Sequence, residues 1–346
     1  MSDTASTAPA SRSALLLLNL GTPDAANASA LRRYLAEFLS DPRVIDLPRA
    51  VWLPVLYGAI LPLRAGRSAA AYRRIWTPEG SPLRVESERL TAAVQDELTA
   101  RAAPITVRLA MRYGSPSIPS VLRELRDQGL RHVLVLPLYP QFSATSTATA
   151  LDAVMAELRT WRWAPELRTI TDYHAEPAWL DAVAGSVRRH WQQRERGQRL
   201  LFSFHGIPQR YVDAGDPYFK HCQASAHGIA QRLQLGETEW QICFQSRVGR
   251  ERWLQPYTAE LLKALPAQGV TRADVVCPGF AVDCLETLEE IAMQASEAFV
   301  EAGGERLSYI PALNSDSAHV TMLTELALRH GGGWRDFDAA LGSAHA

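Results

Sequence analysis

The sequence predicts an α/β protein made of two similar halves, each a four-stranded parallel sheet flanked by helices. Short apolar segments alternate with amphipathic helical stretches, which is typical of parallel strands joined by right-handed crossovers. Strands covered on both faces read as continuous apolar runs bounded by Gly and Pro. The expected strands form two sets, at residues 14–20, 105–111, 132–136 and 167–171, and at residues 200–204, 241–244, 274–277 and 307–310.

The strand ends repeat a pattern in both sets. The first strand is followed by a Gly-x-Pro turn, the second by Arg-x-Gly, and the third by a proline. These features stand at residues 21–23, 112–114 and 137, and again at 206–208, 247–249 and 278. Three matches in the same order indicate a duplicated unit, and a cleft between two such halves is the expected ligand site.

Composition excludes several classes of protein. The chain has 346 residues, of which 47% are hydrophobic and 21% charged, as in a globular enzyme with two domains. A formal net charge of -1 provides no basic field for nucleic acid. Four cysteines without a CxxC pair indicate a reducing compartment, and no apolar run is long enough to span a bilayer. We therefore expect a cytoplasmic protein, and we expect a monomer.

The chain divides into five predicted segments. They are a disordered leader (1–13), an N-terminal half (14–173) that contains a lip insertion at about 41–81, a C-terminal half (174–314), a closing helix (315–330) and a flexible tail (331–346). The lip arises because the gap between the first two strands is about fifty residues longer in the first half than in the second.

The lip has an unusual composition. Residues 50–63 are mostly apolar, and Pro48, Pro54, Pro62 and Gly58 make a long regular helix unlikely there. Arg64, Arg67, Arg73 and Arg74 follow. Such a segment can be ordinary core. We favour an exposed apolar lip with a basic rim, which suits a flat apolar ligand that carries carboxylates, or peripheral contact with a membrane.

His205 stands at the carboxyl end of the strand at 200–204, the edge where open α/β sheets bind ligands. A lone histidine there can equally be a packing residue. Asp283, Glu286 and Glu290 have the spacing of one helix face, with Glu289 pointing elsewhere. Asp283 and Glu286 also fit a capping box. Capping does not explain why Glu290 continues the same helix face. It also does not explain why these acidic residues begin directly after the carboxyl end of a strand.

Seven motifs together resemble one family. They are LLLLNLGTPDA, YRRIWTPEGSPL, MRYGSPS, VLPLYPQFS, SFHGIPQRY, FQSRVGRERWLQPYT and VVCPGFAVDCLETLEEI. In this order, from about Leu15 to His330, they resemble the ferrochelatases, and most closely the proteobacterial ones, which insert ferrous iron into protoporphyrin IX at the end of haem synthesis. The resemblance implies two Rossmann-like halves with the active-site cleft between them. It implies iron as a substrate and no resident cofactor, and because the tail has no cysteine we expect no iron–sulfur cluster.

The resemblance also implies roles for individual residues. His205 corresponds to the catalytic histidine and Glu286 to the acidic metal-site residue, with Asp283 and Glu290 as further acids for protons or metal. Cys284 replaces a histidine that is frequent in the family, and Arg252 replaces a commoner proline. The implied porphyrin contacts are Leu20, Arg64, Ser81, Arg112, Tyr113 and Trp253, with Arg67 an alternative to Arg64.

Metallation of a porphyrin fits these residue types. Two pyrrole N–H protons must leave, the ion must lose water, and the nitrogen lone pairs must tilt out of the ring plane, which a porphyrin bent between two walls achieves. The expected walls are the lip and Trp253, with Arg112 and Ser81 holding the propionates. Neutral imidazole accepts protons near neutral pH, and imidazole with carboxylate suits Fe(II). Whether the acids carry iron in or protons out stays open.

Other functions have weaker support. A tetrapyrrole or haem carrier without chemistry would keep the lip and the arginines, but would not need His205 opposite a row of acids. A chelatase for coproporphyrin, or for another metal or tetrapyrrole, remains an alternative because cobalt and zinc bind N/O sites at least as well as iron. A nucleotide-dependent enzyme is disfavoured because neither first strand is followed by G-x-G-x-x-G.

Overall fold

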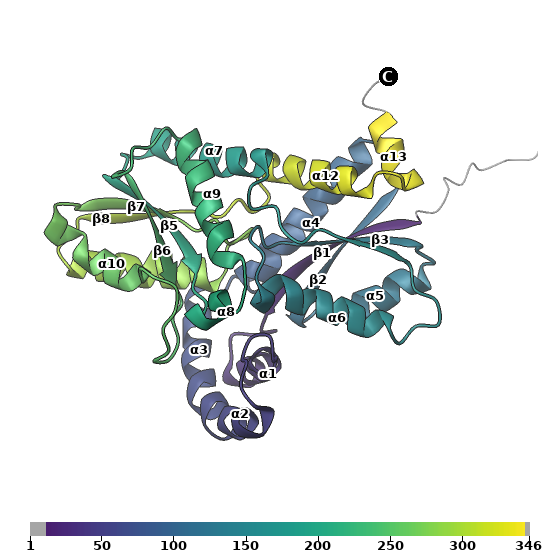
Figure 1. Ribbon diagram of the computed structural model, residues 1–346, viewed down its shortest axis with the longest axis horizontal. Coiled ribbons are helices and arrows are strands. Elements are labelled where there is room, and N and C mark those ends of the chain that lie inside the picture. Colours follow the sequence, from purple (N-terminus) through teal and green to yellow (C-terminus); the bar gives the residue numbers. More distant parts are fainter. Residues whose placement is uncertain (1–11, 343–346) are drawn as a thin grey trace, which may run out of the picture.

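The computed structural model describes residues 12–342 and contains two four-stranded parallel sheets (Figure 1). The sheets have the same order, β2-β1-β3-β4 and β6-β5-β7-β8, which agrees with a duplicated unit. All eight predicted strands are confirmed, with ends that differ by at most three residues. They are β1 (Ser13–Thr22), β2 (Ile105–Gly114), β3 (His132–Pro137), β4 (Glu166–Thr169), β5 (Arg199–His205), β6 (Trp240–Gln245), β7 (Arg272–Val276) and β8 (Arg306–Ile310).

Helices cover both faces of each sheet. In the first half they are α1 (Ala28–Leu39), α2 (Arg49–Val55), η1 (Leu56–Ile60), α3 (Leu61–Ile75), α4 (Pro82–Ala100), α5 (Ile118–Asp127), η2 (Ala144–Ala148) and α6 (Thr149–Leu158). In the second half they are α7 (Pro177–Gln193), α8 (Gln209–Asp213), α9 (Tyr218–Arg232), α10 (Thr258–Ala264), η3 (Pro266–Gln268), η4 (Glu286–Ala295), α11 (Ser296–Glu301), α12 (Ser317–Gly331) and α13 (Arg335–Gly342).

The two sheets share one hydrophobic core. Side chains of β1 alternate between its faces, so that Leu15 and Leu17 belong to one buried cluster while Leu16 and Leu18 belong to another. The cluster of Leu15 and Leu17 also contains Phe202 and Phe204 of β5. A continuous core between the halves therefore fixes the carboxyl ends of β1 and β5 relative to each other.

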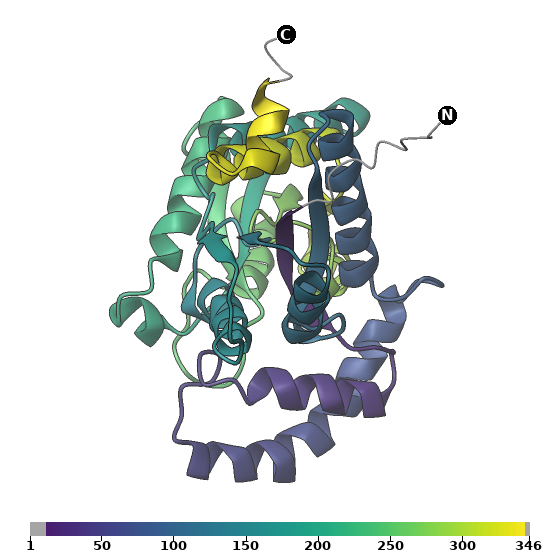
Figure 2. The same ribbon diagram turned by 90° about the vertical axis from the view of Figure 1, so that its right-hand side faces the viewer.

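The lip differs from its prediction. It is helical from Arg49 through Ile75, although prolines were expected to prevent a long helix. The π-helical turn η1 lies between Pro54 and Pro62 and interrupts the regular α-helix where the two backbone donors are missing. In both views α1, α2 and α3 project from the end of the molecule opposite α12 and α13 (Figures 1 and 2).

The predicted flexible tail is wrong as far as Gly342, because α13 packs on the molecule. Trp334 and Phe337 are buried, and the Trp334 ring stacks on His132 with 5.0 Å between ring centroids. The glycine at 331 leaves room for the Phe337 ring, since an added Cβ would lie 2.1 Å from it. The remaining tail residues and residues 1–11 of the predicted leader lie outside the described part of the chain.

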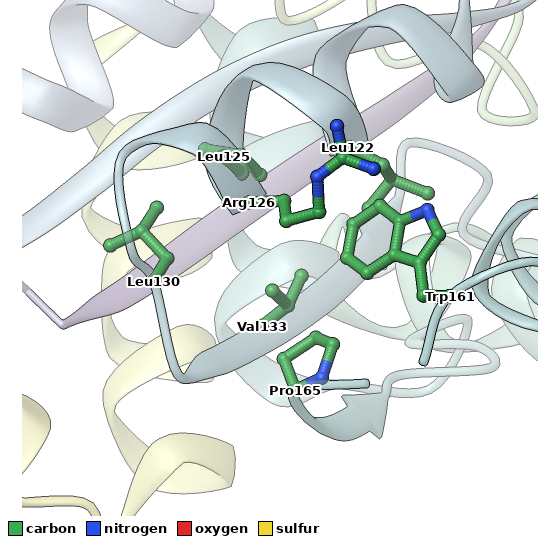
Figure 3. Close-up of a pocket in the computed structure, with 7 residues that line it drawn as sticks. All are labelled: Leu122, Leu125, Arg126, Leu130, Val133, Trp161 and Pro165. Atoms are coloured by element: carbon green, nitrogen blue, oxygen red, sulfur yellow. The ribbon is translucent and has the colours of Figure 1, made fainter. Parts of the chain in front are cut away.

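A shallow apolar recess lies between α5, β3 and the segment at 161–165 (Figure 3). It is lined by Leu122, Leu125, Arg126, Leu130, Val133, Trp161 and Pro165. The Arg126 guanidinium lies 5.2 Å from the Trp161 ring centroid, and the other lining residues are apolar. We interpret this recess as packing of α5 on the sheet, because it brings together no acid, histidine or nucleophile.

Candidate active site

His205 is the last residue of β5, and its ring is only partly exposed. The Nδ1 atom lies 2.6 Å from the carbonyl oxygen of Gly206. A carbonyl oxygen can only accept, so Nδ1 carries the proton and Nε2 keeps its lone pair in the neutral ring. The Tyr218 hydroxyl donates to the His205 carbonyl oxygen at 3.0 Å and holds the backbone. The local structure thus leaves Nε2 of His205 as a proton acceptor or metal ligand.

Two residues at the end of β6 connect His205 to the acidic helix η4. Gln245 pairs with His205 in the sheet register and donates from Nε2 to the Glu286 carbonyl oxygen at 2.8 Å. The Ser246 backbone N–H and hydroxyl each donate to the Glu290 carboxylate at 2.6 Å. Ser246 has a φ of 64°, a left-handed conformation that is uncommon for serine. These bonds place Glu290 beside the carboxyl ends of β5 and β6.

Glu290 has an unusual proton affinity. Burial raises its pKa above 4.5, and the charge of Glu286 adds to this, while the hydrogen bonds from Ser246 and the charge of His205 oppose it. The raised pKa brings the carboxyl group closer to exchanging protons at neutral pH. The sheet pairing of His205 with Gln245, and the hydrogen bonds from Gln245 to Glu286 and from Ser246 to Glu290, bring the three predicted residues to the same strand ends.

Glu286 lies near the first half of the chain. Burial raises the pKa of Tyr72, and the charge of Glu286 is the next cause. Tyr34 is affected in the same direction by burial, by Tyr72 and by Glu286, and its hydroxyl donates to the Gly21 carbonyl oxygen at 3.1 Å. Tyr34 and Tyr72 come from α1 and α3. Leu285, the residue before Glu286, packs against the buried cluster that contains Tyr72, so the start of η4 lies where helices of the first half meet it.

Ion pairs attach the base of the lip to the second half. Arg74 of α3 pairs with buried Glu289 at 2.8 Å and with Glu297 at 3.0 Å. Glu289 accordingly points away from the acid row, as predicted. On the other side Arg210 pairs with Asp46 at 2.9 Å, and the Tyr211 hydroxyl donates to the Val44 carbonyl oxygen at 3.0 Å. Both ends of the lip are therefore held beside His205 and η4.

The position of Asp283 differs from its prediction. It precedes the helix, which begins at Leu285, so it does not continue the face of Glu286 and Glu290. Its carboxylate accepts hydrogen bonds from Tyr309 at 2.6 Å, Asn314 at 2.8 Å and Thr287 at 2.9 Å. Among the hydrogen bonds of residues 12–342 none joins the Glu286 backbone N–H to the Asp283 carboxylate, so the capping box of these two residues does not form. These partners anchor the start of the helix to β8 and the loop after it.

The predicted porphyrin contacts fall into two groups. Leu20 and Trp253 are partly exposed, and the Trp253 ring centroid lies 6.5 Å from that of His205. Arg64 and Arg67 are exposed, and neither has an ion-pair or hydrogen-bond partner within residues 12–342. Tyr113 and Ser81, in contrast, are 0% and 2% exposed. Their contact with a porphyrin stays a prediction.

Arg112 is bound to a carboxylate that the sequence analysis missed. Its Nη2 donates to Asp41 Oδ2 at 2.5 Å and its Nε to the Thr149 hydroxyl at 2.7 Å. The same Asp41 oxygen accepts from the Tyr113 hydroxyl at 2.9 Å and from Thr149. Asp41 is 6% exposed and lies where α1 meets the lip. Arg112 therefore supports the base of the lip, and its expected contact with a propionate stays a prediction.

Two hollows in the structure, the recess of Figure 3 and a groove between α7 and α12, are lined by neither His205 nor Glu290. The cleft between the halves stays a prediction. Of the missed residues, Gln245 and Ser246 could have been found from their place at a strand's carboxyl end. No sequence pattern around Asp41 indicates that it belongs to the site.

Comparisons with known proteins point to one family. The chain matches the family described as Ferrochelatase over residues 12–331. A relative from Nitrosococcus oceani with that description is 53% identical over 327 residues, which are 94% of this chain and 89% of the relative. Another from Methylococcus capsulatus is 51% identical and covers 92% of this chain and 96% of its own. The structure of SirB from Bacillus subtilis with Fe3+ aligns with a TM-score of 0.52 at 12% identity, covering 77% of this chain and 94% of that one, and supports the fold alone.

Proposed function

This chain belongs to the ferrochelatase family and inserts ferrous iron into protoporphyrin in haem synthesis, and on that premise we propose how His205, Glu286 and Glu290 share the chemistry. The family consists of metal chelatases, so the carrier alternative is set aside. The observation that supports the assignment best is geometric: Gln245 pairs with His205 and donates to the Glu286 carbonyl oxygen, and Ser246 donates twice to the Glu290 carboxylate. Each metallation must release two protons and bind one ferrous ion.

His205 accepts the first pyrrole proton. Its Nε2 lone pair is available because Nδ1 is committed to the Gly206 carbonyl oxygen. Glu290 accepts the second proton, or the first one from His205, and passes it to solvent, which its raised pKa favours. Glu286 contacts the ferrous ion, because it is the first residue of η4, where that helix meets α1 and α3 of the first half. Asp283 does not touch the substrates, and it contributes by anchoring the start of η4.

The porphyrin lies between the lip and Trp253. Leu20 at the end of β1 and the Trp253 ring beside His205 provide apolar contact with the macrocycle. Arg64 and Arg67 are exposed lip cations without ion-pair or hydrogen-bond partners within residues 12–342, so they are candidates for the propionates. Arg112 and Tyr113 hold the wall in place through Asp41.

The role of Glu286 is tested by comparing two identical substitutions on η4. We expect Glu286→Gln to raise the KM for ferrous iron at least about tenfold, because an ion contact loses its charge. Glu289→Gln is the matched control, since Glu289 pairs with Arg74 outside the proposed site. The measurement is anaerobic initial rate against iron concentration at saturating protoporphyrin. Equal KM values for Glu286→Gln and wild type would refute the metal role.

We also propose that the lip docks on a membrane surface. Val51 and Leu63 are 63% and 66% exposed, and Val55 and Tyr57 are exposed beside them. Arg64 and Arg67 add positive charge next to this apolar surface, which favours anionic lipids. None of the helices in residues 12–342 has the length and apolar character needed to cross a bilayer. Contact through the lip would be peripheral and would place a poorly soluble substrate at the active site.

Vesicle binding tests the lip. We expect Val51→Asp/Leu63→Asp to reduce binding to phosphatidylglycerol vesicles at least about tenfold, because each apolar side chain withdrawn from lipid costs about 1.5–3 kcal/mol. Met155→Asp is the control, since Met155 is an exposed apolar residue on α6, away from the lip. Co-sedimentation measures the bound fraction. Wild-type protein that stays in the supernatant, or a lip variant that sediments like wild type, would contradict the proposal.

A further inference from the structure

A cluster of metal-ligating side chains lies outside the proposed iron-insertion site. Asp172 and His174 follow β4, and His221 lies in the first turn of α9. One donor atom from each of the three lies within 4.8 Å of the donor atoms of the other two. All three residues are partly buried, and none is bonded to His205, Glu286 or Glu290 by the hydrogen bonds and ion pairs of residues 12–342.

The rings are held close together by both halves of the chain. The His174 and His221 rings stack with 3.6 Å between centroids and 8° between planes. His174 Nδ1 lies 2.7 Å from the Asp172 carboxylate, and the Phe142 backbone N–H donates to His221 Nδ1 at 3.2 Å. The contributing segments come from the loop after β3, the segment after β4, and α9. The donor atoms therefore lie close together, and the two parallel rings must rotate before both nitrogen lone pairs can point at one ion.

Neighbouring hydrogen bonds fix this arrangement. Ser225, one turn after His221 on α9, donates to the His174 carbonyl oxygen at 2.9 Å and accepts from Gln141 at 2.9 Å. The Asp216 carboxylate accepts from the Ser143 hydroxyl and the Ala144 backbone N–H at 2.9 Å and 2.8 Å. Because these bonds connect the two halves, the cluster lies at a rigid boundary between them.

The donor set selects a class of ion. Two imidazole nitrogens and one carboxylate oxygen suit divalent first-row transition ions such as Fe2+, Co2+ or Zn2+, with water in the remaining positions. Mg2+ and Ca2+ prefer sets made entirely of oxygen. Stacked imidazoles also favour the neutral forms that bind metals, since two adjacent imidazolium charges repel. Consistent with this, burial and then His174 lower the pKa of His221.

We propose that Asp172, His174 and His221 form a second divalent transition-metal site at the boundary between the two halves. An ion there would take the place of the Asp172–His174 hydrogen bond and of the 3.2 Å contact from the Phe142 amide. It would cross-link the segment after β4 to α9, so it would stabilise the folded chain in proportion to its affinity. The site is separate from iron insertion and does not depend on the roles given above to His205 and Glu286.

Cobalt binding tests the site. The background is the full-length His205→Ala/Glu286→Gln variant, in which the iron-insertion site has lost its proposed ligands. We expect equilibrium dialysis to find one Co2+ per chain, visible d–d absorption of the bound ion, and a Tm that rises with Zn2+. Adding His221→Ala or Asp172→Asn should weaken Co2+ binding at least about tenfold. Adding His227→Ala, which removes an exposed histidine of the same helix, should leave binding unchanged.

Circular dichroism identifies variants that do not fold. If His221→Ala does not fold, Asp172→Asn still tests the site, because asparagine has nearly the same size and shape as aspartate. A background protein that binds no Co2+ would overturn the proposal. Binding of equal affinity in the background and in its folded His221→Ala and Asp172→Asn variants would overturn it as well, because the ion would then lie elsewhere.

Discussion

Replacing His205 by alanine is expected to reduce kcat for iron insertion into protoporphyrin at least about 100-fold, the usual contribution of a positioned acid–base group. The imidazole is the proton acceptor with a free lone pair at the end of β5, because its other nitrogen is bonded to the Gly206 carbonyl oxygen. The ring is partly exposed and its removal leaves β5 intact, so the loss should be catalytic. Anaerobic initial rates at saturating iron and porphyrin measure it.

His227→Ala is the control for this experiment, since that histidine is exposed on α9. It should retain wild-type kcat. Quenching of protein fluorescence should show that His205→Ala still binds protoporphyrin, because Leu20, the lip and Trp253 are untouched. A folded His205→Ala enzyme with near-normal turnover would make His205 a packing residue of the turn.

Replacing Asp41 by alanine is expected to lower the free energy of unfolding by about 3–5 kcal/mol, the cost of removing one partner from a buried ion pair. Asp41 is nearly inaccessible and accepts hydrogen bonds from Arg112, Tyr113 and Thr149. Without it the Arg112 guanidinium, which is only 20% exposed, has lost its ion-pair partner. Urea denaturation measures the change. Arg43→Ala is the control, because Arg43 pairs with exposed Asp152, and such pairs contribute little.

The Asp41 network also predicts a dependence of stability on pH. Burial alone would raise the pKa of Asp41, but hydrogen bonds from Thr149, the Arg43 backbone and Tyr113 outweigh it and lower that pKa below 3.8. A carboxyl group with a lowered folded-state pKa stabilises the protein above its unfolded pKa and loses this contribution as pH falls through the folded value. The stability difference between wild type and Asp41→Asn should therefore shrink below about pH 4. A difference that is constant from pH 7 to pH 3 would show that Asp41 does not act through its charge.

The fold could be predicted from local patterns because each strand is buried on both faces. Residues 14–20 and 200–204 are apolar except for Asn19 and Ser203, since helices cover both sides of β1 and β5, so their pattern can be interpreted without knowing the partner strands. Duplication gave the common strand order of the two sheets. The helical lip was missed because proline propensity is local, whereas the π turn between Pro54 and Pro62 depends on how the lip packs.

Site residues could be predicted only where their place at a strand end or on a helix face indicates their function. His205 and Glu290 were found because a strand end and a helix spacing place them. Asp41 and Arg112 are 71 residues apart, and no periodicity reveals that they meet. Tyr113 is buried for the same reason, since the helix that covers it is distant in sequence. The cluster at Asp172, His174 and His221 was overlooked because its members come from separate segments.

The most direct test of the account is the single-turnover rate constant for iron insertion into protoporphyrin already bound to His205→Ala, measured anaerobically with excess ferrous iron. This measurement excludes porphyrin binding and haem release, so it reports the proton and metal steps alone. The account predicts a full complement of bound porphyrin and a rate constant at least about 100-fold below that of wild type. Metallation at the wild-type rate would contradict it.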